Sequence, residues 1–563
     1  MPLPLLAVAV LGVLAAGYLL YGRFVARQYA LDDARATPAT TRADGVDFVP
    51  TGRFYLMGQH FSAIAAAGPI VGPILACQTW GWLPCVLWIG LGVVFVGAVH
   101  DLTALVASVR HGATSIADVA RRHLGRRAWL ALTAFIWLAL VYVIVAFTDA
   151  TTGTFLGNVE ELPDGTSFHK GGGVAAAATL YLTVAVLMGF VVRRFAPRTW
   201  VLSVVFVPLV LGCVWLGTVG DVSMVLRLGP TTWYVVILAY CVVASMVPVW
   251  ALLQPRGFLG GFVLYLALAA GVVGVLFGGH EVRQPAVAEA TEGFGKDLFP
   301  FLFVTIACGA CSGFHGLVCG GTTSKQIAKE SHCRPVGYGA MLLEAFVALI
   351  ALSTVLVLSP AEVKGAKPGA IYTEGIARFL APIVGGGQAA HDFARVFAGM
   401  AFSTFVFDTL DVATRLGRYL LQELFGAPGR KGALVATLAT AAVPLGILFA
   451  GGGAAFARNW LLFGSANQLL AGLTFLSCAV WLRSTGRRCW YVLAPGVFVL
   501  AITTWSVGQH AHRGLASLLA HGLDLEGLNG LVATAMLGLS AVFLVEAWRA
   551  TRRLRTGAPP PAA

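Results

Sequence analysis

Long apolar segments recur along the whole chain and restrict its possible folds more than any other feature. Stretches of about 17 apolar residues or more, separated by glycine, proline or charged clusters, form fifteen candidate membrane spans. Their approximate limits are 2–22, 61–78, 81–109, 128–148, 173–192, 199–219, 232–253, 258–277, 297–319, 338–358, 392–410, 433–450, 459–482, 491–507 and 529–550. Only 11% of the residues are charged, too few to coat a water-soluble fold of this length. The sequence therefore predicts an all-α, polytopic membrane helix bundle.

The distribution of basic residues predicts the orientation of these spans. If the N-terminus lies outside, 28 of the 38 Lys and Arg residues fall in cytoplasmic segments. This arrangement accounts for the net charge of +12 by membrane topology, so we expect no nucleic-acid partner. No basic segment precedes residues 2–22, and Arg23 and Arg27 follow them, so we expect a retained anchor rather than a signal peptide. The C-terminus is predicted to be cytoplasmic.

One predicted span carries two Gly-Pro pairs close to its middle. Gly68-Pro69 and Gly72-Pro73 are one helical turn apart. Proline lacks the N–H that a helix needs and disfavours helix at the preceding residue, so the pairs are expected to open the backbone there. Open backbone inside a membrane is tolerated beside a cavity. The alternative is a kinked but continuous helix that packs through its small residues.

A second interruption is predicted in the span that begins near Phe299. It carries five glycines, at 309, 313, 316, 320 and 321. Two broken helices that are far apart in a transporter sequence point to a central substrate site, because their free N–H groups can bind anions. Close helix packing through small residues is the alternative interpretation.

A few ionisable residues fall within the predicted spans, where a charge costs roughly 2.5–3.5 kcal/mol on insertion scales. They are His100, Asp101, His315, Glu344, Asp408, Asp411 and Arg415. Glu344 is interpreted either as a proton carrier or as a hydrogen-bonded structural acid. Asp411 and Arg415 are four residues apart and are expected to form an ion pair, whereas Asp408 is expected to lack a partner and to carry a proton.

Three cysteines and a histidine recur at helical spacing. Cys308, Cys311, His315 and Cys319 could supply soft ligands to zinc or copper if the helix unwinds at Gly313. On a continuous helix they would extend over about 16 Å and could not surround one ion. We expect the cysteines to act as small packing residues, with no metal and no other cofactor.

Five segments together resemble the carbon starvation protein A family of bacterial inner-membrane transporters. They are HFSAIAAAGPIVGP at 60–73, TIACGACSGFHGLVCGGTTSKQ at 305–326, GYGAMLLEAFVALIAL at 337–352, TLDVATRLGRYLLQE at 409–423 and LFGSANQLLA at 462–471. The resemblance implies an inverted-repeat, LeuT-like core with two broken helices, and accessory helices beside it. On this basis residues 1–60 form an anchor helix and a cytoplasmic loop. Residues 61–482 form the transporter core with accessory spans at 232–277, and residues 483–563 form further accessory spans and a short cytoplasmic tail.

The resemblance also implies the function and the site. It implies uptake of peptides or of pyruvate during carbon starvation, by proton symport and alternating access, and no enzymatic activity. The implied substrate-binding residues are Gly68, Pro69, Gly72, Pro73, Gly309, Ser312, Gly313 and His315. Family motif positions also include Thr322, Thr323, Glu344, Asp411, Thr414, Arg415, Asn467 and Gln468.

The coupling ion is expected to be a proton, carried by Glu344, Asp408 or Asp411. Sodium is the alternative, because Thr404 and Thr409 belong to a hydroxyl-rich segment. Two other functions compete with transport: a membrane metal or redox protein built on the Cys/His stripe, and a nutrient sensor. The expected partners are a small-molecule substrate and the lipid bilayer.

Overall fold

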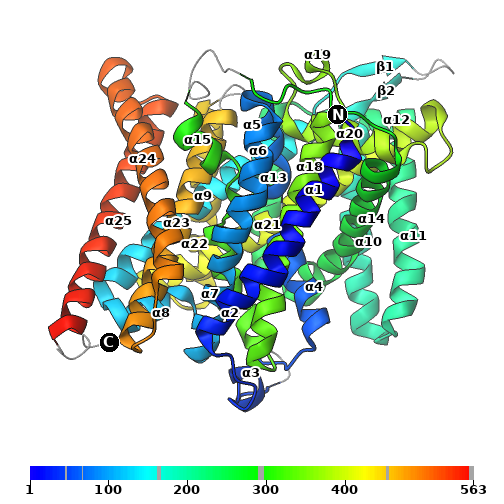
Figure 1. Cartoon of the computed structure of the whole chain (residues 1–563). Helices are drawn as coiled ribbons and strands as arrows, with labels where there is room; N and C mark the ends of the chain where they lie inside the picture. Colours follow the sequence, from blue (N-terminus) through cyan, green and yellow to red (C-terminus); the bar gives the residue numbers. More distant parts are fainter. Residues whose placement is uncertain (45–46, 66, 162–166, 289–296, 452–455, 557–563) are drawn as a thin grey trace. The chain divides into compact units, whose positions relative to one another are not determined.

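The computed structural model describes residues 1–44, 47–65, 67–161, 167–288, 297–451 and 456–556 (Figure 1). Within these residues, twelve helices are long and apolar enough to cross a membrane, and they coincide with twelve of the fifteen predicted spans. The described strands are β1 (Val159–Glu161) and β2 (Ser167–His169), which pair antiparallel. The predicted all-α class is confirmed. Residues 557–563, the end of the predicted tail, lie outside the described residues.

The other three predicted spans differ from long single helices. The span at 61–78 is part of α4 (Arg53–Ile64) and α5 (Gly68–Trp80), which are bent by 51° relative to each other. The span at 232–253 is the 17-residue α13 (Pro230–Met246), after which Pro248 interrupts the helix. The span at 297–319 is divided among three short helices. Counting the bent pair as one span gives at most thirteen, so the predicted number of fifteen is not confirmed.

The chain divides into two compact units that do not follow chain order. Unit 1 comprises residues 1–7, 140–285 and 350–459, and unit 2 comprises residues 8–139, 286–349 and 460–563. Four helices include residues of both units: α1 (Leu3–Ala16), α9 (Arg126–Phe155), α18 (Ala340–Leu356) and α23 (Phe456–Ser484).

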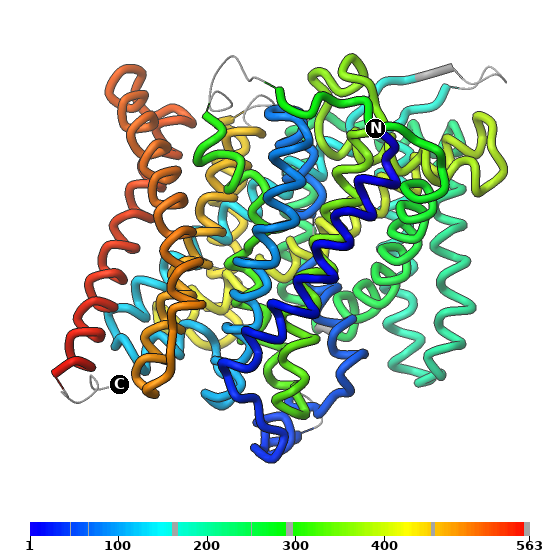
Figure 2. The backbone as a smooth tube through the Cα atoms, in the orientation of Figure 1, coloured from blue at the N-terminus to red at the C-terminus, as the bar shows by residue number. Residues whose placement is uncertain are grey.

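Unit 1 otherwise consists of β1, β2, α13 and the following elements: α10 (Lys170–Phe195), α11 (Thr199–Gly217), α12 (Gly220–Val225), η3 (Val249–Ala251), α14 (Leu253–Phe277), α19 (Pro360–Val363), α20 (Pro368–Leu380), α21 (Gly387–Phe425) and α22 (Gly429–Gly451). Helices α10 and α11 run side by side (Figure 2). The C-terminal carbonyls of α13 accept hydrogen bonds from two arginines of α21. Arg415 donates to the carbonyls of Ala244 and Val247, and Arg418 donates to that of Ser245. These bonds satisfy backbone groups that a helix end leaves without partners.

Unit 2 otherwise contains α4, α5 and these elements: η1 (Gly17–Tyr21), α2 (Gly22–Tyr29), α3 (Pro38–Thr41), α6 (Trp82–Leu87), η2 (Trp88–Gly97), α7 (Ala98–Arg110), α8 (Ile116–Leu124), α15 (Leu298–Thr305), α16 (Ala307–Ala310), α17 (Gly313–Gly321), η5 (Thr323–Gln326), η6 (Glu330–His332), η7 (Arg334–Gly339), α24 (Trp490–His521) and α25 (Leu525–Thr556). Helices α24 and α25 form a pair (Figure 1) in which Gly514 faces Gly530. A Cβ atom at either glycine would meet the opposite backbone, so the close packing of the two helices requires glycine at both positions.

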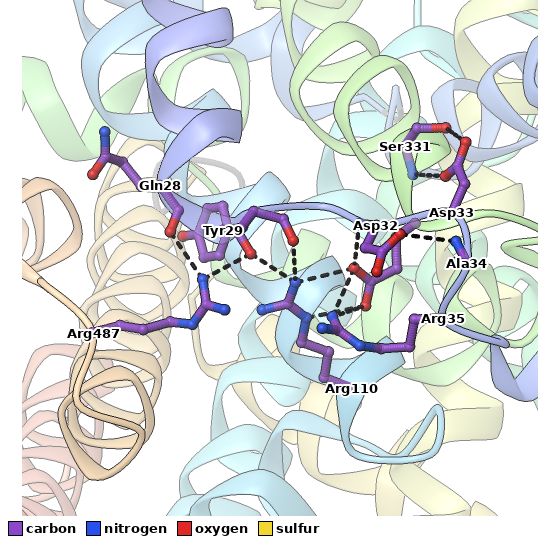
Figure 3. Close-up of polar contacts among 11 residues, drawn as sticks. Gln28, Tyr29, Asp32, Asp33, Ala34, Arg35, Arg110, Ser331 and Arg487 are labelled. Atoms are coloured by element: carbon purple, nitrogen blue, oxygen red, sulfur yellow. Dashed lines mark hydrogen bonds and ion pairs between the residues drawn. The ribbon is translucent and has the colours of Figure 1, made fainter.

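A network of charged groups fixes the segment that follows α2. Glu330 is 2% exposed and pairs with Arg35 at 2.7 Å and with Arg110 at 3.0 Å. Arg110 also donates to the carbonyl of Tyr29, and Arg487 donates to the same carbonyl (Figure 3). Glu330 therefore joins segments that are far apart in the sequence.

Replacing Glu330 by Gln should lower the stability of the protein. The variant leaves two guanidinium groups without their shared carboxylate, which we expect to cost about 2–3 kcal/mol. Nine of the ten cysteines are buried, so thermal unfolding can be followed with a thiol-reactive dye. The control is Asp47→Asn, because that side chain is 66% exposed and pairs only loosely with Lys325, at 3.5 Å. Equal unfolding temperatures for the two variants would contradict the structural role of Glu330.

Candidate functional site

The second predicted interruption is confirmed in unit 2. Helix α15 ends at Thr305, and the four-residue α16 follows. Cys311 and Ser312 then adopt extended backbone conformations, and α17 begins at Gly313. The backbone therefore leaves the helix at the position where the glycine-rich sequence predicted a break.

The first interruption lies earlier than predicted. The helix stops at Ala65, and α5 starts at Gly68 with Pro69 in its first turn, where its missing N–H costs no helical bond. Gly72 and Pro73 lie inside α5, so the expectation that this pair opens the backbone is wrong. One proline in a helix that is packed on its neighbours removes a single backbone hydrogen bond, and packing can offset that loss.

The glycines of α5 allow the two interrupted segments to pack closely within unit 2. A Cβ at Gly68 would meet the Cys308 side chain, and one at Gly72 would meet the carbonyl of Thr305. Gly309 in turn faces Pro69 and Ala348. Close packing through small residues, the alternative considered for both segments, therefore describes these glycines in the structure.

The first turn of α17 is held by an amide side chain from α23. Asn467 Oδ1 accepts from the backbone N–H of Phe314 at 2.9 Å, and its Nδ2 donates to Ser312 Oγ at 3.0 Å. Asn467 is 3% exposed. It therefore occupies one of the N–H groups that an anion could bind, and Gly313 and His315 supply other N–H groups at the same helix end.

His315 lies between two buried carboxylates. Its Nδ1 is 2.9 Å from Asp101 Oδ2, and its Nε2 is 3.1 Å from Glu344 Oε2. All three side chains are at most 1% exposed. The helices α7, α17 and α18 thus bring together two residues of the predicted site and Asp101, which the sequence marked only as an ionisable group within a span.

This cluster, Asp101–His315–Glu344, can share and exchange a proton. Each contact between a ring nitrogen and a carboxylate oxygen is attractive only if a proton lies between them. Nδ1–H meets this need toward Asp101, and the proton between Nε2 and Glu344 can belong to either group. Apart from the 3.1 Å contact of Oε2 with His315 Nε2, the Glu344 oxygens have no hydrogen-bond partner among the described residues, so Oε1 can accept a proton.

Two more histidines surround the cluster. His100 Nδ1 lies 2.8 Å from the other oxygen of Asp101, and His100 Nε2 has no hydrogen-bond partner in the described part of the chain. His60 contacts Thr323 Oγ1 at 2.8 Å. Cys319 Sγ lies 3.9 Å from His60 and 3.6 Å from the carbonyl of Asp101. No group of three or more metal-ligating side chains occurs among the residues that the structure describes, and both nitrogens of His315 already face carboxylates.

Unit 1 holds a second buried charge cluster, centred on Arg256 of α14. Arg256 is 1% exposed and contacts both Asp408, through its Nε at 2.9 Å, and Asp411, through Nη1 at 2.5 Å. The hydroxyl of Tyr240 accepts from Nη1 at 2.6 Å and donates to Asp411 at 2.9 Å. Asp411 is fully buried, whereas the Asp408 side chain is 37% exposed.

Two predictions about this cluster are wrong. Asp408 has a partner, and Asp411 pairs with Arg256 instead of with Arg415, whose guanidinium is drawn to the C-terminal carbonyls of α13. Arg256 lies between the predicted spans 232–253 and 258–277, so it was not among the ionisable residues expected within spans. Its position at the start of a 25-residue apolar helix was the signal that could have identified it.

The two hydroxyl groups predicted as sodium ligands, those of Thr404 and Thr409, differ in their surroundings. Thr409 bonds to the carbonyl of Phe405 in its own helix. Thr404 is 1% exposed, and its Oγ1 has no partner within the described residues. Its methyl group and Asp408 Oδ2 both lie against Gly260.

Comparisons with known proteins match a family model and several named proteins. A family model described as "Carbon starvation protein CstA" matches residues 3–374 and 361–506. The pyruvate/proton symporter BtsT of Escherichia coli (strain K12) is 30% identical, over 89% of this chain and 81% of its own. The peptide transporter CstA of Bacillus subtilis (strain 168) is 31% identical, over 96% of each chain. A crystallised manganese transporter of Eremococcus coleocola aligns with a TM-score of 0.45 at 13% identity, covering 89% of this chain and 97% of its own.

Replacing Arg256 by Leu should destabilise unit 1 strongly. The substitution leaves Asp411 buried without its cation, which typically costs about 3–5 kcal/mol. The double variant Arg256→Leu/Asp411→Leu removes both buried charges and should regain most of the loss, because Asp408 can be hydrated. Thermal unfolding of the purified variants measures both effects. A double variant as unstable as the single one would show that the loss arises from packing and not from the unpaired carboxylate.

Proposed function

The chain belongs to the carbon starvation protein CstA family and is a multi-pass inner-membrane transporter, and we propose that it imports small carboxylate-bearing nutrients together with a proton. Peptides and pyruvate are the proposed substrates, and carbon starvation is the proposed condition of use. The observation that carries the proposal is the position of His315 between Asp101 and Glu344, with all three side chains buried.

The cluster supplies a reason for coupling. An anion near His315 makes it more favourable for Glu344 to hold a proton, because one negative charge is then removed from a low-dielectric site. By the same linkage, a protonated Glu344 makes anion binding more favourable. Alternating access would load both ligands from outside and release both into the cytoplasm, the side predicted to hold the C-terminus.

The substrate carboxylate is proposed to bind at the N-terminus of α17. Ser312, Gly313 and His315 lie there, where free N–H groups favour an anion. Asn467 is suited to gate this position, because the Phe314 N–H that it occupies becomes available when its side chain turns away. Gly309, Gly68, Pro69, Gly72 and Pro73 form the tightly packed wall beside it.

Asp408 and Asp411 are proposed as the alternative proton carriers, because Arg256 compensates one of their two charges and leaves the other. A proton on either acid neutralises the cluster. Sodium at Asp408 and Thr404, with Thr409 on the same helix, is the alternative. Proton coupling fits better, because Thr409 already bonds to its own helix.

The voltage dependence of uptake distinguishes the two proposed substrates. Pyruvate that moves with one proton is electroneutral, whereas a zwitterionic peptide with one proton carries a charge, worth about 2.3 kcal/mol per 100 mV. The test uses purified protein in liposomes, with the pH gradient and the voltage imposed separately. If pyruvate is the substrate, its uptake should not depend on the voltage. If a dipeptide is the substrate, its uptake should increase with an inside-negative voltage. No uptake of either compound would contradict the proposal.

The Glu344→Gln variant should lose uptake against a gradient but keep exchange of substrate across the membrane. The amide cannot release a proton, yet its shape preserves the contact with His315. Counterflow and pH-driven uptake in the same liposomes measure the two activities. Glu281→Gln is the matched control, because Glu281 is exposed. Full pH-driven uptake by Glu344→Gln would exclude Glu344 as the proton carrier.

A further inference from the structure

Unit 1 contains an open cavity of about 400 Å³ whose charged lining is entirely basic. His280, Arg283, Arg378 and His391 line it, together with apolar residues and glycines. Leu3 N–H donates to the carbonyl of His280 at 3.0 Å, so the cavity lies at the end of unit 1 where the chain begins. The basic-residue distribution predicts that this end is external. We propose that the cavity binds a small carboxylate anion.

The basic groups are not equally available to a ligand. Arg378 pairs with Glu362 and lies 3.6 Å from Glu374, and His391 lies 3.3 Å from Glu374. Neither acid is among the residues that line the cavity. The charges of Arg378 and His391 are therefore largely compensated within the protein.

Arg283 has the uncompensated charge. Its backbone N–H donates to the carbonyl of Leu356 at 2.8 Å, which fixes the chain at this point. Its side chain is exposed, and its guanidinium has no hydrogen bond or ion pair among the described residues. A planar guanidinium with free N–H groups can bind both oxygens of a carboxylate at once.

The arginines that line the cavity affect the pKa of His280. Burial first, and then the nearby Arg378 and Arg283, lower the pKa of His280. This histidine follows the membrane-spanning α14 and is half-buried. A neutral imidazole beside a free guanidinium offers an additional hydrogen bond to an anion without adding a second cation.

The size and the rim of the cavity fit a small ligand. Its volume lies within the roughly 300–1,000 Å³ of typical ligand sites. Gly386 and Gly387 line the cavity with φ angles of 71° and 79°, and no atom lies within 4 Å of the position of a Cβ on either. Their backbone conformation favours glycine and leaves this part of the rim clear.

The ligand class follows from the proposed function, and the inference rests on it to that extent. A basic cavity at the external end would raise the local concentration of an anionic nutrient before it reaches the transport site. The site needs only weak affinity for this purpose, because tight binding would retain the nutrient.

The test is equilibrium binding of radiolabelled pyruvate to the purified full-length protein, measured by scintillation proximity at low ionic strength. In the His315→Gln background, whose side-chain amide can still donate a hydrogen bond to a buried carboxylate, Arg283→Gln should weaken pyruvate binding at least fivefold. The matched control Arg227→Gln removes another exposed arginine of unit 1 that does not line the cavity and should leave binding unchanged. Equal affinity of the two variants would overturn the proposal.

Competition binding shows whether the cavity recognises the charge of the ligand or only its shape. Acetate should displace the pyruvate that Arg283 holds, and acetamide should not, because only acetate carries the charge. Equal displacement by both would also overturn the proposal. Pyruvate binding that depends on Arg283 but not on His315 belongs to the cavity, and it would persist even if the protein did not transport pyruvate. Failure of the proposed function can therefore be distinguished from failure of this site.

Discussion

Buried charge is the constraint on which both units depend. Each unit places one cationic or protonatable side chain between two carboxylates: His315 between Asp101 and Glu344 in unit 2, and Arg256 between Asp408 and Asp411 in unit 1. An isolated charge in such surroundings costs several kcal/mol, so none of these groups is tolerable alone. The helices that carry them must therefore stay in register with one another, and the small residues of α5 and α16 make the close approach possible in unit 2.

The two clusters differ in what their central group can do. A guanidinium does not release its proton at any physiological pH, so Arg256 is a permanent charge that holds its helices together. An imidazole exists with or without its second proton, so His315 can exchange one with a neighbouring carboxylate. The central group of the unit 1 cluster therefore has a fixed charge, whereas the central group of the unit 2 cluster can itself change charge.

The sequence predicted the helical class, twelve of the spans and the second interruption, because apolar length and glycine clusters act locally. It also identified His315 and Glu344 by their presence in apolar surroundings. It could not predict that Asp411 prefers Arg256 to Arg415, because that choice depends on which helix ends lie nearby. Gly72-Pro73 was misinterpreted for the same reason, because the packing of Gly72 inside α5 involves Thr305 and Ile306, which are far away in the sequence.

Access to unit 1's cluster follows from its geometry. Arg256 and Asp411 are buried and in direct contact, and the Tyr240 hydroxyl forms a hydrogen bond with each of them. Asp408 is 37% exposed and contacts the same guanidinium. A proton that arrives at Asp408 weakens its hold on Arg256, which then binds Asp411 more strongly. Of the two acids, Asp408 is therefore the one that water can reach, while Asp411 remains in contact with Arg256.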